Sequence, residues 1–184
     1  MMLKCKIVKK AFILLALSIL FSCKNESKFD LEKDLYEFSE KMENGDTLEV
    51  NVDHSACMFA AYERYNFVKE NDTLYLETHS EISSFEKKQQ TLPTIIYPFK
   101  PNNSLSFENY FKYLKNENRA NRKYGSPLVT VYYPNKNQRQ YFNDDGLDDK
   151  FKKLDKLLSI REKIYPNDKF FEFPEPPPPP PSRK

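Results

Sequence analysis

The chain has 184 residues, with 29 basic and 27 acidic side chains and a formal charge of +2. This near balance excludes the clear basic excess that nucleic-acid-binding proteins carry. Three residues are glycine, and they are too far apart for the glycine-rich loops that hold phosphate in P-loop and dinucleotide-binding enzymes. We therefore expect neither nucleic acid nor a cofactor among the ligands.

The first 22 residues have the layout of a secretory signal. A basic part with four lysines and no acids precedes an apolar run from Ala11 to Phe21, which is followed by the small residue Ser22. This run is about half of the roughly 20 residues that a helix needs to span a bilayer. It is also hydrophobic on every side, unlike a helix packed on a domain. The pattern predicts a removable signal over residues 1–22.

Leu20-Phe21-Ser22-Cys23 resembles the lipobox of bacterial lipoproteins, and Ser22-Cys23-Lys24 looks like the form found in Bacteroidota, although Phe21 is larger than the usual occupant. The resemblance implies cleavage before Cys23 and a diacylglycerol on its sulfur, with further acylation for stable anchoring. The resemblance therefore implies that the protein is attached to a membrane of the cell envelope by the lipid on Cys23. We expect the outer membrane, with the inner membrane or the cell surface as alternatives.

Removal of the signal would leave 162 residues, enough for one domain with a hydrophobic core. The mature chain would hold 25 basic and 27 acidic residues, since four lysines leave with the signal. Cys5 would leave with it and Cys23 would carry lipid, so Cys57 could form no intramolecular disulfide. Free cysteine is among the most buried residue types, so we expect Cys57 to be buried rather than reactive.

The mature chain begins with a polar stretch, residues 23–45, which we interpret as a tether that includes a short helix around Leu35. The domain then extends over residues 46–168. Its first predicted strand covers residues 47–53, where apolar and polar residues alternate with the period of a half-buried strand.

Two further strands are predicted over residues 60–69 and 73–78, with Asn71 and Asp72 as the turn of a hairpin. Residues 91–99 predict either a further strand or an extended segment. A strand there would lie at an edge, because its two prolines cannot donate to a neighbouring strand.

Apolar residues at helical spacing predict a helix from about residue 105, which Ser104 or Ser106 could cap. A second hairpin follows, with β-branched and aromatic residues over 128–133 and a return over 139–142. The last helix is predicted by an apolar stripe of Leu147, Phe151, Leu154 and Leu158.

Four acids surround the start of that last helix and resemble a calcium loop. They lack the alternate oxygen ligands and the closing glutamate of an EF-hand. We interpret Asp144 or Asp145 as the helix cap instead. Asp148 and Asp149 lie in the first turn, where the helix dipole favours negative charge.

Together these elements predict an α+β fold, a small antiparallel sheet built from hairpins with two helices packed on one face. Residues 169–184 form a proline-rich tail with six consecutive prolines, Pro176 to Pro181. Such a run adopts polyproline II and is either a stiff projecting stub or a segment that docks on an aromatic groove.

The sequence predicts no catalytic residue and no metal ligand. His54, Cys57 and His79 could be imagined around zinc, but a structural zinc site needs four ligands and no second cysteine completes the set. Cys57 and His54, with Asp53, could form a nucleophile set. Residues this close along a strand alternate in direction, however, which would point His54 and Cys57 apart.

Asp46-Thr47-Leu48 and Asp72-Thr73-Leu74 resemble the site that Bacteroidota glycosylate on exported proteins, which makes Thr47 and Thr73 candidate sugar acceptors. The segment from Cys57 to Leu76 is similar to small lipoproteins of that phylum, a resemblance that implies no known activity. Tyrosine and phenylalanine are abundant, at 12 and 15 residues, and such side chains can anchor interfaces as well as cores.

We interpret the chain as a non-enzymatic binding or structural module of the envelope, with an envelope protein as a possible partner. The alternatives are a small envelope hydrolase whose site is assembled from scattered residues, and an immunity lipoprotein against a toxin.

Overall fold

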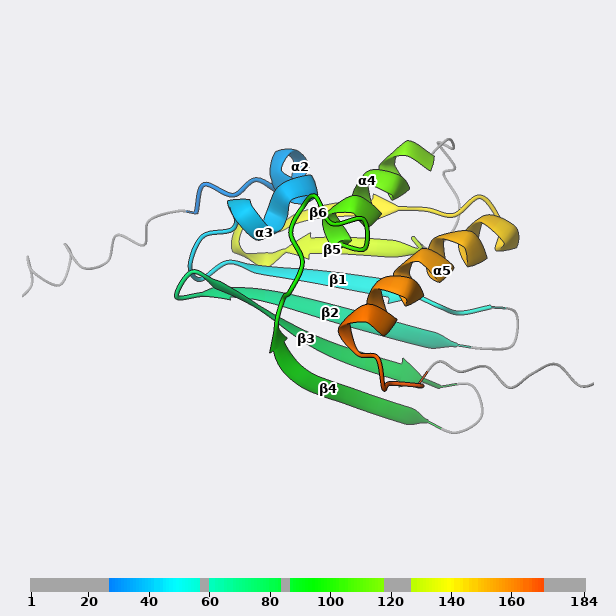
Figure 1. Ribbon diagram of the computed structural model, residues 1–184. Coiled ribbons are helices and arrows are strands. Elements are labelled where there is room, and N and C mark those ends of the chain that lie inside the picture. The colour runs from blue at the N-terminus through cyan, green and yellow to red at the C-terminus, as the bar shows by residue number, and fades with distance from the viewer. Residues whose placement is uncertain (1–26, 57–59, 84–86, 118–126, 171–184) are drawn as a thin grey trace, which may run out of the picture.

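The computed structural model describes residues 27–56, 60–83, 87–117 and 127–170. It has an α+β fold in which six antiparallel strands form one sheet and the helices lie on one side of it (Figure 1). The strands follow the order β4-β3-β2-β1-β5-β6 across the sheet. Their bounds are β1 Thr47–Asp53, β2 Ala61–Glu70, β3 Thr73–Ile82, β4 Lys88–Ile96, β5 Val129–Tyr133 and β6 Gln138–Phe142.

The helices come from four parts of the chain. Their bounds are α2 Leu31–Asp34, η1 Leu35–Glu37, α3 Phe38–Lys41, α4 Phe107–Glu117, η2 Pro134–Lys136 and α5 Leu147–Ile164. No helix in the described ranges is both long enough and apolar enough to cross a bilayer.

The hairpin of β2 and β3 confirms the turn predicted at Asn71 and Asp72. Both residues have positive φ, 49° and 61°, as the two central residues of a tight hairpin turn require. Asparagine and aspartate tolerate this left-handed backbone better than other side chains do. The turn sets the register in which Val68 pairs with Tyr75 and Arg64 pairs with His79.

Strand β4 forms one edge of the sheet, as predicted from its prolines. It pairs with β3 alone, and the pairing shifts register between Leu76 and Thr78. Pro93 lies in this strand. Irregular pairing and proline both discourage a further strand from adding to such an edge.

Residues 27–45 belong to the domain, so the prediction of a tether over 23–45 is wrong for this part. Phe29, Leu31, Leu35 and Phe38 are at most 1% exposed and lie in the hydrophobic core. The Phe38 ring packs edge-on against Phe67 of β2, with ring centroids 4.8 Å apart. The charged residues between these apolar ones lie on the outer side of α2 and α3, which gave the stretch its polar composition.

The buried face of α5 differs from the predicted stripe. Leu147 and Phe151 are 50% and 49% exposed, whereas Lys150 and Lys153 are buried. Lys153 can be buried because its ammonium donates to the carbonyl of Asn143 at 2.9 Å and pairs with Asp149 at 2.6 Å. A lysine can be buried when its ammonium has hydrogen-bond and charge partners. The apolar periodicity of the sequence does not show such a lysine, because it assigns the inner face of the helix to apolar residues alone.

The two predicted helix caps have different outcomes. Ser106 caps α4, because its Oγ accepts a hydrogen bond from the amide of Asn109 at 3.2 Å. The prediction of Asp144 or Asp145 as the cap of α5 is wrong, since Gly146 occupies the cap position with φ 110°. Asp149 instead accepts the amide of Asp145 at 2.8 Å, which satisfies one donor beside the helix start.

Candidate functional site

The sheet has two faces of different character. Side chains alternate between the faces along each strand, so Glu63 and Tyr65 point to the helices while Tyr62 and Arg64 point away from them. The helices seen in Figure 1 all lie on the first face. We call the second face, toward which Tyr62 and Arg64 point, the open face.

Beneath α5, the inner face holds a cluster of ionisable groups centred on Glu63. The Glu63 carboxylate contacts Nε2 of His54 at 3.2 Å and Nε of Arg161 at 2.6 Å. It also accepts a hydrogen bond from the hydroxyl of Ser80 at 3.3 Å. The Glu63 side chain is fully buried and that of Arg161 is 5% exposed. A ligand in solvent therefore has no access to this carboxylate.

The inner cluster connects four elements of the fold, namely β2, β3, β4 and α5. Arg161 of α5 also pairs with Asp168, whose carboxylate accepts a hydrogen bond from Gln90 of β4 at 3.2 Å. Burial, and then the nearby Glu63 carboxylate, raise the pKa of the Tyr65 phenol well above its usual value. A closed and mutually paired set of this kind holds α5 to the sheet, and we assign it a structural role.

The structure does not bring the two histidines together. His54 follows β1 and is buried against Glu63 on the inner side, whereas His79 of β3 lies on the open face with its Nδ1 3.0 Å from the Thr91 hydroxyl. Within the ranges that the structure describes, no three His, Cys, Asp or Glu side chains converge as a metal site would require. Cys57 lies outside the described residues.

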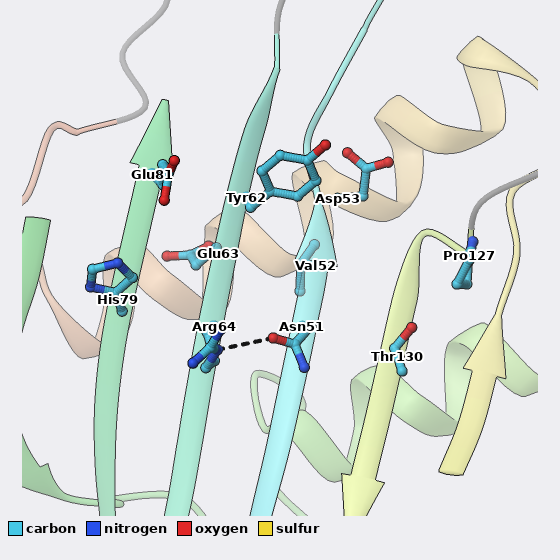
Figure 2. A pocket seen from close by; sticks show the side chains of 10 residues that line it. All are labelled: Asn51, Val52, Asp53, Tyr62, Glu63, Arg64, His79, Glu81, Pro127 and Thr130. Atoms are coloured by element: carbon cyan, nitrogen blue, oxygen red, sulfur yellow. Dashed lines mark hydrogen bonds between the residues drawn. The ribbon is translucent and has the colours of Figure 1, made fainter. Parts of the chain in front are cut away.

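The open face is hollowed near the end of β1. The hollow has a volume of about 420 Å³ and is lined from four neighbouring strands, β3, β2, β1 and β5. Figure 2 shows its side chains. The lining residues are Asn51, Val52, Asp53, Tyr62, Glu63, Arg64, His79, Glu81, Pro127 and Thr130. The side chains of Val52 and Glu63 are buried on the inner face, so the groups that a ligand could reach belong to the other lining residues.

One row of polar side chains crosses the hollow because of the strand register. Asn51 pairs with Arg64, and Arg64 pairs with His79 on the next strand. Nε of Arg64 donates to the amide oxygen of Asn51 at 3.1 Å, the bond drawn in Figure 2. On the other side of Asn51 lies Thr130 of β5. Arg64 therefore has one hydrogen bond to a neighbour on the same surface.

A second row lies beside the first and holds an aromatic ring between two acids. Tyr62 pairs with Asp53 on one side and with Glu81 on the other. Its side chain is 52% exposed, so the ring stands in solvent at the rim of the hollow. A hydrogen bond from Gln89, and then the charge of Lys87, hold the pKa of Glu81 below its usual value.

These two rows suit binding better than catalysis. They combine hydrogen-bond donors, carboxylate acceptors and an exposed aromatic ring, a set that fixes the orientation of a ligand. None of the lining residues that the structure describes is a serine, cysteine or lysine, three of the side chains that serve as nucleophiles. The sequence reasoning missed Asn51, Tyr62, Arg64 and Glu81. The available signal was the alternation of β2, which places Tyr62 and Arg64 on one face.

The predicted modification sites lie away from the hollow or outside the described residues. Cys23 belongs to the part of the chain that the structure does not describe, as does the proline run. Thr47 and Thr73 are the first residues of β1 and β3, and each is partly exposed. Glycosylation at these two threonines stays a prediction.

No protein-family model matches the chain, and no curated protein or solved structure matches it either. The assignment of function therefore depends on the residues of this chain alone.

Proposed function

We propose that the protein is a lipid-anchored binding module of the cell envelope, and that the open face of its sheet is the ligand-binding surface. The observation that supports this most is the hollow of about 420 Å³ on that face, within the size range of small-ligand sites. Side chains around it are already held in position by hydrogen bonds to their neighbours.

The anchor is inferred from the first 23 residues. A basic segment, a short apolar run and Leu20-Phe21-Ser22-Cys23 together fit a lipoprotein signal, whose cysteine receives the lipid. Two or more acyl chains on one residue are sufficient for stable membrane attachment.

Hydrogen bonds between side chains of this surface favour a binding role, because they reduce the conformational entropy that is lost when a ligand orders those side chains. The inner cluster gives the sheet a rigid support on its other face. A binding surface on a sheet held in this way keeps its geometry better than one on a loop.

The anchor is tested by metabolic labelling with an alkyne palmitate in a bacterial host that processes lipoproteins. We expect label on the wild-type chain and on the control Cys5→Ala, and none on Cys23→Ala, because Cys5 leaves with the signal. Label that persists on Cys23→Ala would contradict the proposed attachment.

The binding surface is tested by placing a photo-crosslinking benzophenone amino acid at Tyr62, and separately at Lys163 on the exposed side of α5. We expect crosslinks to envelope material from position 62 alone, and we expect Arg64→Ala to abolish them. Equal crosslinking from both positions, or none from position 62, would refute the assignment of the open face.

A further inference from the structure

We infer that the hollow on the open face binds an uncharged oligosaccharide. This inference rests on the proposed function, because it names the ligand class of the same surface. Three properties of the lining support it: the mixture of donors and acceptors, the balance of charge, and the exposed ring of Tyr62.

The hydrogen-bonding groups of the hollow match hydroxyl groups. Each hydroxyl of a sugar both donates and accepts a hydrogen bond, so a sugar site needs acceptors and donors close together. Glu81 supplies a carboxylate acceptor on one side of Tyr62. Asp53 lies on the other side, where its carboxylate accepts the amide of Ser55 and pairs with Lys150 of α5. Arg64 supplies donors, since its Nε is bonded to Asn51 and no described residue bonds its two terminal nitrogens.

The charges of the hollow are largely balanced, which disfavours a strongly charged ligand. Asp53 faces Lys150 of α5 with the charged atoms 3.7 Å apart, and Glu81 faces Lys87 at 3.6 Å. Arg64 is then left as one cation among polar neighbours. A phosphate site would collect several cations around one point, and a site for a basic peptide would leave several acids unmatched.

Tyr62 supplies a flat apolar surface beside these polar groups. Its side chain is 52% exposed and stands next to Asp53 (Figure 2). A tyrosine ring offers a hydrophobic face and a polar hydroxyl at low conformational cost. The C–H face of a sugar ring can pack on it while the hydroxyls at the ring edge reach the carboxylates.

The extent of the hollow favours an oligosaccharide over a single sugar. Its lining comes from four adjacent strands. At about 4.8 Å between neighbouring strands these span roughly 14 Å, which exceeds the width of one sugar ring. Arg64, His79 and Glu81 are each held by a neighbour, namely Asn51, Thr91 and Gln89. Each of these three side chains thus has a hydrogen-bonded neighbour along that length.

The test is isothermal titration calorimetry of the detergent-solubilised full chain against uncharged hexasaccharides of glucose, mannose, galactose and N-acetylglucosamine. We expect saturable binding to at least one hexasaccharide, weakened at least about tenfold by Tyr62→Ala and by Arg64→Ala. Lys163→Ala on α5 is the matched control and should bind as the wild type does. Far-UV circular dichroism of each variant confirms that the fold is kept.

Absence of saturable binding to all four hexasaccharides overturns the inference, as does binding that neither variant at the hollow weakens. Polyglutamate and polylysine of similar length are titrated as charged probes, and tighter binding to either one also overturns it. None of these results alters the crosslinking from position 62. Loss of the oligosaccharide inference is therefore distinguishable from failure of the proposed binding surface.

Discussion

Replacing Arg161 by methionine tests whether the inner cluster holds α5 to the sheet. The change removes a guanidinium that is 5% exposed and leaves two carboxylates, those of Glu63 and Asp168, without their cation. Breaking a buried ion pair by removing one partner costs about 3–5 kcal/mol, because the remaining charge stays buried without compensation. Methionine keeps most of the side-chain volume, so the fall in the free energy of unfolding reflects the missing positive charge rather than a new cavity.

The free energy of unfolding is measured by urea denaturation of the detergent-solubilised full chain, followed by far-UV circular dichroism. Lys163→Met is the matched control, because Lys163 is an exposed cation on the same helix, and we expect it to change the free energy by at most about 0.5 kcal/mol. For a domain of this size, a loss of about 3–5 kcal/mol lowers Tm by roughly 6–20 °C.

The double variant Glu63→Leu with Arg161→Met should recover part of the loss, since replacing both partners of a buried pair is often nearly neutral. If Arg161→Met comes within about 1 kcal/mol of Lys163→Met, the structural role assigned to the cluster is wrong.

Phe38→Ala should lower the free energy of unfolding by about 3–5 kcal/mol, because Phe38 is fully buried in the core, while the exposed Glu37→Ala should have little effect. If residues 27–45 were a free tether, neither variant would lower the free energy of unfolding. Tyr133→Phe should make unfolding less sensitive to pH between about 10 and 12. Burial, and then the hydrogen bond to Asp46, raise the pKa of Tyr133 to about 12. The stability that this phenol contributes is therefore present below its ordinary pKa of about 10 and is lost as pH rises toward 12. Urea unfolding at about pH 9 and pH 11.5 measures the difference, and equal pH sensitivity in the two proteins would contradict the assignment.

Much of the fold could be predicted from local patterns, because those patterns reflect burial on one face. The alternation over 47–53 became β1, and Asn71 and Asp72 became the hairpin turn. The failures have a common cause. Residues 27–45 and the inner face of α5 mix buried apolar residues with charged ones, and local composition does not show which charges find a partner in the folded chain.

The candidate site was less predictable, since it depends on contacts between strands. Asn51, Arg64 and His79 are separated by 13 and 15 positions in the sequence, and the register of three strands places them in one row. His54 lies just after the end of β1. Its contact with Glu63 arises because the β1–β2 pairing brings their two strands together.

Under the proposed lipidation, the early start of the folded domain would limit how far the protein extends from a membrane. The Ser27 hydroxyl donates to Asp46, just before β1, so the domain begins four residues after Cys23. Four residues span at most about 14 Å even when fully extended. The hollow lies at the other end of β1, near Asp53, roughly 20 Å farther along the strand. Under the proposed lipidation, the attachment end of the sheet would lie against the lipid surface and the hollow would face outward. The distance at which the protein meets a ligand would then be set by the size of its domain rather than by a long linker.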